Sequence, residues 1–134
     1  MTGLVLRLAP HERVLLNGAV IENGDRRTSL SIKTPNANVL RLRDAIHPEQ
    51  ANTPVKRTIY MLQLVLSGDS RVEDVRAPLL RSMDQLGEAF RDADSQHLLR
   101  AASAHVLSEE YYLALKALRL LLPMESHLLA RGAS

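Results

Sequence analysis

The sequence contains no cysteine and no tryptophan among its 134 residues. Without a thiol the chain has no disulfide, no thiolate nucleophile and no thiolate-bound zinc or iron–sulfur site, and this composition fits a reducing compartment. No apolar stretch reaches the roughly 18 residues of a membrane span, and the N-terminal MTGLVLRLAP lacks the long apolar core of a secretion signal. We therefore expect a cytoplasmic protein that does not span a membrane.

Aromatic residues are also scarce, at 3% of the chain. They are Phe90 and three tyrosines, and none of them lies in the first fifty residues. A stacking platform of the RNP type is excluded, because that platform presents aromatic rings from its strands. Any recognition of RNA by this half of the chain must use arginine side chains and backbone groups.

The sequence does contain enough apolar material for one domain. Hydrophobic residues make up 46% of the chain and charged residues 24%, a composition typical of folded rather than disordered proteins. A length of 134 residues is that of a single domain. We expect one compact unit and exclude a second large catalytic domain.

Positive charge is concentrated in the N-terminal half. Residues 1–57 carry nine Lys and Arg against five acids, a net charge of +4, whereas residues 58–134 carry eight against ten, a net charge of −2. Arginine outnumbers lysine fourteen to three. The planar guanidinium suits phosphates and guanine edges, although a GC-rich genome would produce the same surplus. The basic half is the better candidate for contact with an anionic partner.

Period-two patterns in the first fifty residues predict four or five short antiparallel strands. Leucine occupies every second position of Leu4–Leu8, and Pro10 ends or bends that strand. Arg13–Leu16 and Ala19–Glu22 flank Asn17-Gly18, a dipeptide typical of a type I′ hairpin turn.

Two further strands follow. The even-numbered residues of Arg27–Lys33 share one face, and a loop by composition occupies residues 34–38. Val39–Arg43 then alternates again, with leucine at the even positions and Arg41 and Arg43 together on the opposite face.

Helix signals dominate after residue 50. Thr53 can cap a helix whose first residue is Pro54, and the apolar run Ile59–Leu66 ends at Ser67-Gly68. Because this helix is apolar nearly all round, we expect it to be central.

Three more helical segments are expected. Ser70 and Glu73 have the spacing of a capping box for a helix whose apolar stripe extends to Phe90, with Pro78 causing a kink or a late start. Another helix begins near Asp94 or Ser95. Ser108 can cap the last helix, which Pro123 bends or ends.

These elements predict an α+β fold, in which a small N-terminal antiparallel β-sheet region (residues 1–50) is followed by a C-terminal helical hairpin or bundle (residues 51–134). The expected core positions in the helices are Leu62, Val65, Leu86, Leu115 and Leu118.

No catalytic or cofactor motif is present. The five histidines form no metal-binding spacing, and His97 and His105 are separated by two helical turns. Asp92 and Asp94 lie at an expected helix junction, where acids serve as caps. No phosphate-binding glycine loop occurs. We expect no enzymatic activity, no cofactor and no metal.

The N-terminal strands offer a basic strip instead. The sheet could bring five arginines together against a phosphate backbone or an exposed base, and the candidate RNA-binding residues are Arg7, Arg26, Arg27, Arg41 and Arg43. The alternative is a solvated basic face that protects a sheet edge from aggregation.

In the helical half, residues 111–122 contain more apolar positions than one packed helix face needs, so they either pack in the core or contact a partner protein.

Three blocks of sequence resemble the FlbT family of flagellar biosynthesis regulators. They are NGAVIENGDRRT at residues 17–28, QANTPVKRTIY at 50–60 and YYLALKALR at 111–119. They occur in the family's order and span nearly the whole chain. The resemblance implies a post-transcriptional regulator that associates with the 5′ untranslated region of flagellin mRNA and represses translation or promotes mRNA decay. Some members of the family act positively, so the sign of regulation stays open.

A second resemblance concerns the strands. Segments 4–8, 12–16, 18–21, 31–35 and 42–46 are similar in order to the small carbon-storage-regulator fold, whose dimer binds messenger leaders along its outer strands. An arginine just after the last strand contacts RNA there, and Arg43 is the matching position. This resemblance ranks Arg43, Arg41 and Arg7 above the other arginines.

Two hypotheses follow. One is an RNA-binding regulator that uses the basic sheet, with a flagellin messenger leader as its partner. The other is an adaptor or chaperone-like module that binds a flagellar protein through the helices. The sequence leaves the oligomeric state, including a homo-oligomer, open.

Overall fold

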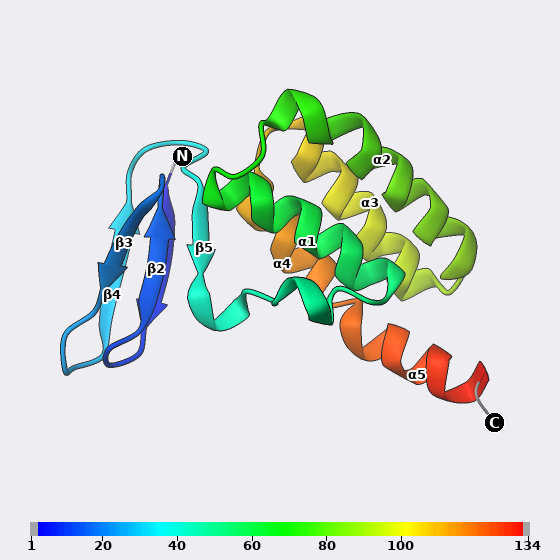
Figure 1. The fold of residues 1–134 in the computed structure, drawn as a ribbon, viewed down its shortest axis with the longest axis horizontal. Coiled ribbons are helices and arrows are strands. Elements are labelled where there is room, and N and C mark those ends of the chain that lie inside the picture. Colours follow the sequence, from blue (N-terminus) through cyan, green and yellow to red (C-terminus); the bar gives the residue numbers. More distant parts are fainter. Residues whose placement is uncertain (1–2, 133–134) are drawn as a thin grey trace.

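The computed structural model describes residues 3–132. Within that range two small antiparallel sheets precede five α-helices, so the predicted α+β class is confirmed (Figure 1). Strand β1 (Leu4–Leu8) pairs with β4 (Thr28–Ile32) in one sheet. In the other, β2 (Arg13–Leu16) lies between β3 (Ala19–Glu22) and β5 (Val39–Arg41).

The hairpin between β2 and β3 forms as the Asn-Gly dipeptide predicts. Asn17 and Gly18 both have positive φ, at 50° and 86°, which is the backbone of a type I′ turn. The turn sets the register, in which Leu16 pairs with Ala19 and Arg13 with Glu22.

The prediction for β5 is wrong in one respect. The strand ends at Arg41, and the chain turns into a short 3₁₀ helix, η1 (Leu42–Asp44). All three residues of β5 are buried, because β2 pairs with the strand and helix α1 packs against it. A strand covered in this way does not alternate between a buried and an exposed face.

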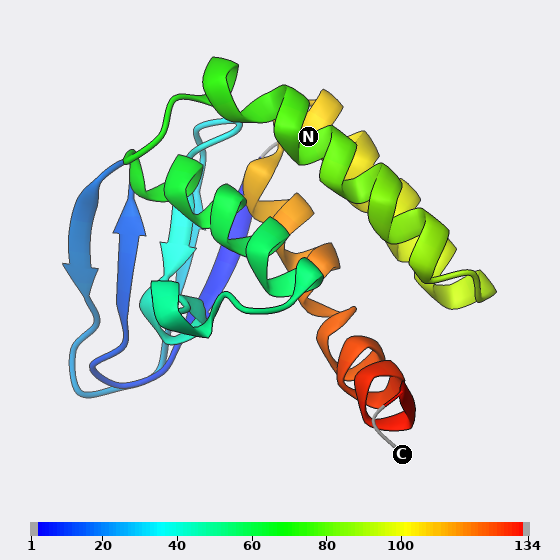
Figure 2. The ribbon, with the colours of Figure 1, turned by 45° about the vertical axis from the view of Figure 1, so that its right-hand side comes forward.

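The helical half follows a short 3₁₀ turn, η2 (Pro48–Gln50). Its helices are α1 (Pro54–Ser67), α2 (Val72–Ala89), α3 (Ala93–Leu107), α4 (Tyr111–Arg119) and α5 (Leu122–Gly132). Helix α1 contacts β5, α2, α4 and α5, which confirms its central place, and the far end of α5 extends away from the other helices (Figure 2).

Both ends of α1 match the prediction, and one contact adds to it. The Thr53 side chain accepts a hydrogen bond from the Lys56 amide, and Gly68 closes the helix in the left-handed conformation. In addition, the buried Glu125 carboxylate of α5 accepts hydrogen bonds from the Val55 amide at 2.9 Å and from the Thr53 hydroxyl. An acid from the last helix therefore caps the first one.

The predicted start of α2 is wrong. Arg71 is the N-cap residue, and its side chain makes no capping hydrogen bond. The Ser70 amide instead donates to the Leu64 carbonyl at the end of α1, while the Glu73 carboxylate pairs with Arg71. The helix continues through Pro78 rather than starting after it.

The later helices confirm one cap and correct another. Asp92 accepts a hydrogen bond from the Ser95 amide at the start of α3, as expected for an acid at a helix junction. Ser108 is the C-cap of α3, not the N-cap of α4, because the chain makes a further turn through Glu110. Helix α4 ends at Arg119, and Pro123 lies in the first turn of α5, where its missing amide proton is tolerated.

The predicted core positions Leu62, Val65, Leu86, Leu115 and Leu118 are all buried. We expect Leu62→Ala or Leu118→Ala to lower the free energy of unfolding by about 2–5 kcal/mol, because each removes a fully packed side chain. Urea denaturation measures the change. Leu107→Ala, at a residue that is 58% exposed, is the matched control and should stay within about 0.5 kcal/mol of the parent. Equal losses at buried and exposed positions would contradict this assignment.

Candidate nucleic-acid interface

A buried ion pair lies beside the two sheets. The Arg41 guanidinium donates from Nε to Oε2 of Glu12 at 2.8 Å and from Nη2 to Oε1 at 2.9 Å. The two side chains are 10% and 5% exposed. The same Nη2 also donates to the Arg7 carbonyl, and the Ala9 amide donates to Glu12. The prediction that Arg41 projects from an exposed strand face is therefore wrong: its guanidinium joins β5 to β1 and to the loop that follows β1.

The pair remains charged at neutral pH. The hydrogen bonds from Arg41 lower the pKa of Glu12 from 4.5 to about 2, against the opposing effect of burial, and the Ala9 amide and Arg43 contribute in the same direction. Glu12 in turn raises the pKa of Arg41, with a smaller contribution from the Tyr112 hydroxyl of α4. The pair thus joins the two sheets, because Arg41 on β5 bonds both Glu12 and the Arg7 carbonyl of β1.

Three of the five candidate arginines surround one concave surface. Arg7 on β1, Arg27 just before β4 and Arg43 in η1 line a hollow of about 310 Å³. The other lining residues are Leu8, Ala9, Thr28 and Ser29. We call this set of seven residues the basic hollow. It includes no acidic residue.

The strand register positions Arg7 and the hydroxyl side chains of the hollow. Arg7 is opposite Ser29 and points outward, while Leu8, opposite Thr28, is buried. The Asn23 side chain holds the adjoining loops together: its amide donates to the Ala9 and Arg26 carbonyls, each at 2.8 Å, and its Oδ1 accepts from the Thr28 hydroxyl. Asn23 therefore ties together the two loops that flank the basic hollow.

Arg43 reaches the hollow from the opposite side. Its Nε lies 3.5 Å from Oε2 of Glu12 and 4.0 Å from Oδ1 of Asp44, yet its side chain is 56% exposed. Asp44 is shared with Arg119 of α4, whose Nη2 is 3.6 Å away. Part of the Arg43 guanidinium is thus left accessible to a ligand.

The remaining candidate, Arg26, is exposed and does not line the hollow. The structure therefore brings Arg7, Arg27 and Arg43 together, places Arg41 beneath them as a support and leaves Arg26 outside. Sequence reasoning missed Glu12, which lies in a loop and matches no motif, and it gave no site role to Asn23, which belongs to the Asn23-Gly24 dipeptide. The basic N-terminal segment had already indicated Arg7, Arg27 and Arg43 as candidates, and the alternation of Leu4–Leu8 had directed Arg7 outward.

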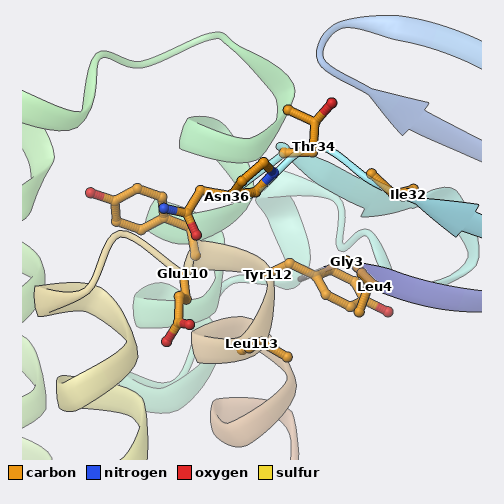
Figure 3. Close-up of a pocket in the computed structure, with 11 residues that line it drawn as sticks. Gly3, Leu4, Ile32, Thr34, Asn36, Glu110, Tyr112 and Leu113 are labelled. Atoms are coloured by element: carbon orange, nitrogen blue, oxygen red, sulfur yellow. The ribbon is translucent and has the colours of Figure 1, made fainter. Parts of the chain in front are cut away.

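Two further cavities involve residues of the helices. One, of about 240 Å³, lies between the start of β1, loop 34–37 and the N-terminus of α4, and Tyr112 and Leu113 contribute to its wall (Figure 3). The other is a groove of about 380 Å³ between α1, α2 and α5.

In residues 3–132 no group of three or more histidines and acids is placed to hold a metal ion. Within the same residues, no helix combines the length and apolar character needed to cross a membrane.

The Glu12–Arg41 pair predicts a specific sensitivity to acid. Because the pKa of Glu12 is about 2 in the folded chain and 4.5 when unperturbed, the pair stabilises the fold above pH 4.5, and this stabilisation is lost as the pH falls toward 2. We expect Glu12→Gln to cost about 3 kcal/mol at pH 7, and the difference from the parent should shrink between pH 4.5 and 3. Urea denaturation across this range measures both effects.

Glu22→Gln is the control for that experiment. Glu22 pairs with Arg13 at 2.7 Å, but both side chains are exposed, so its removal should leave the stability and its pH dependence close to those of the parent. Parallel pH profiles for the parent and Glu12→Gln would contradict the role assigned to the buried pair.

Comparison with known proteins identifies similar sequences along nearly the whole chain. The sequence profile of the family described as "Flagellar protein FlbT" matches residues 4–129. The flagellum biosynthesis repressor protein FlbT of Caulobacter vibrioides (strain ATCC 19089) is 31% identical over 131 residues, covering 98% of this chain and 92% of that protein.

Two other relatives are each named a probable flagellum biosynthesis repressor protein FlbT. The protein of Rhodopseudomonas palustris (strain TIE-1) is 35% identical over 130 residues, covering 96% of this chain and 98% of its own length. The protein of Chelativorans sp. (strain BNC1) is 34% identical over 128 residues, covering 95% of this chain and 86% of its own length. No solved structure gives a significant match.

Proposed function

This chain belongs to the FlbT family of flagellar proteins, and we propose that it binds the 5′ untranslated region of flagellin mRNA and represses translation or promotes decay of the message. Its relatives are named as repressors of flagellum biosynthesis rather than as enzymes. The proposed activity takes place in the cytoplasm, where the messenger is translated, and needs no cofactor.

The observation that carries the proposal is the convergence of Arg7, Arg27 and Arg43 on the basic hollow. These side chains come from three separate segments of the chain, and they are exposed. Guanidinium groups bind phosphate oxygens through paired hydrogen bonds, so a concave surface with three of them favours a nucleic-acid backbone. A basic face that only protects a sheet edge would not require a hollow.

Charge balance around the hollow supports the same conclusion. Glu12 is the acid nearest to Arg43, and its carboxylate already accepts hydrogen bonds from Nε and Nη2 of Arg41. Asp44 is likewise shared between Arg43 and Arg119. Arg7 and Arg27 have no ion pair to any residue from 3 to 132. The positive charge on the rim therefore remains available to an anionic partner.

Substitution of the rim arginines tests the proposal. We expect Arg7→Gln with Arg43→Gln to weaken binding to a flagellin leader and to flatten its salt dependence, with the slope falling by about 0.7 for each phosphate that the variant no longer binds. Fluorescence anisotropy at several salt concentrations measures both quantities. Circular dichroism checks the fold, which should persist because both side chains are largely exposed.

The chain supplies a matched control in two adjacent arginines. Arg27 lines the hollow and Arg26 does not, although both are exposed. Arg27→Gln should weaken binding, whereas Arg26→Gln should change it little. Unchanged affinity and salt slope in the folded Arg7/Arg43 variant, or equal effects at positions 26 and 27, would remove the hollow from the RNA site.

A second candidate function rests on the groove beside α5. Its wall combines the buried Leu86 and Phe90 with Leu128 and Leu129, which are 43% and 52% exposed. Such a surface suits an apolar helix of a partner protein, and here the partner would be a flagellar protein. This candidate does not exclude RNA binding, because the groove and the basic hollow share no residue.

The two functions can be separated by substitution in α5. If the groove binds a flagellar protein, Leu128→Asp with Leu129→Asp should remove that protein from material purified with the chain, and RNA affinity should be unchanged. The control is Leu107→Asp, at an exposed leucine on α3. Loss of the partner in the control as well, or its retention in the α5 variant, would argue against the groove.

A further inference from the structure

We propose that the basic hollow holds a single unpaired nucleotide, with its phosphate on the rim arginines and its sugar and base over the floor. This inference rests on the proposed function and specifies the form of RNA that the site accepts. The hollow is lined by three arginines and by four uncharged residues, Leu8, Ala9, Thr28 and Ser29; we call the arginines its rim and the uncharged residues its floor.

The floor offers contacts that a flat phosphate-binding face would lack. Ala9 supplies apolar surface, to which Leu8 adds little because it is only 5% exposed, and Thr28 and Ser29 also line the hollow. The Thr28 hydroxyl donates to Asn23, so its oxygen is left to accept a hydrogen bond, whereas Ser29 can donate or accept. A lining that combines uncharged apolar residues with hydroxyl-bearing ones suits a base and a ribose.

The size of the hollow limits what can enter. Its volume of about 310 Å³ lies near the lower end of the ~300–1,000 Å³ found for small-ligand sites. A base that is paired within a duplex points toward its partner and cannot turn into such a hollow, whereas an unpaired nucleotide can. The geometry therefore favours single-stranded RNA without any aromatic stacking from the strands.

Contacts within the chain restrain the rim without a ligand, at the Arg7 backbone, at the Arg43 side chain and beside Arg27. Arg41 donates to the Arg7 carbonyl, and Glu12 holds both Arg41 and, at 3.5 Å, Arg43. Arg27 is adjacent to Thr28, whose hydroxyl is bound to Asn23. A site that is ordered in advance loses less conformational entropy on binding. Glu12 is in this sense a positioning residue, since it lies beneath the rim and does not line the hollow.

The test compares one RNA in two forms. The flagellin leader is used single-stranded or annealed to its complement, with the full chain at one salt concentration. We expect the single strand to bind at least about tenfold more tightly than the duplex, and to shift the amide resonances of Ala9, Thr28 and Ser29 in NMR spectra. Arg27→Gln should reduce this preference, and Arg26→Gln should retain it.

The failure of this inference is distinguishable from the failure of the proposed function. If single strand and duplex bind equally, and both weaken when Arg7 and Arg43 are substituted, the function stands and the nucleotide site is refuted. If inorganic phosphate alone reproduces the same amide shifts, the hollow is an anion site only and the inference also fails. If neither form of the leader binds, both proposals fail.

Discussion

The N-terminal half of this protein is organised around one buried ion pair, Glu12–Arg41. The carboxylate accepts two hydrogen bonds from the guanidinium, which also bonds the β1 backbone, so three separate segments meet at one point. A buried pair is costly to desolvate and contributes most when its donors and acceptors are satisfied. Here Arg41 is the last residue of β5, and Glu12 also lies 3.5 Å from Arg43, so the pair joins the end of that strand to an arginine that lines the basic hollow.

This arrangement separates two roles that the sequence places side by side. Arg41 and Arg43 are two residues apart, and a regular strand would give them the same environment. The switch from β5 to η1 after Arg41 removes that equivalence. One arginine is then buried in an ion pair, and the other is exposed and lines the basic hollow. Arginine is suited to both, because its guanidinium stays charged and offers five donors in a plane.

The fold was largely predictable because its signals are local. Asn17-Gly18, Thr53-Pro54 and Gly68 act within a few residues, and each behaves as its chemistry requires. The site was only partly predictable, because it depends on contacts between distant segments. Glu12 meets Arg41 across 29 residues and Asn23 meets Ala9 across 14. The capping box expected at Ser70 failed for a similar reason over a shorter distance. The Ser70 amide donates to the Leu64 carbonyl at the end of α1, a contact that the capping-box spacing does not reveal.

The capping of α1 by Glu125 has a consequence for synthesis on the ribosome. The Val55 amide and its acceptor are 70 residues apart, so the first turn of the central helix lacks this partner until nearly the whole chain has emerged. The residues of the strands and the basic hollow all precede residue 46 and leave the ribosome earlier. Because α1 packs against β5, the sheets gain their cover only as the helices follow, and the last contact of the central helix waits for α5.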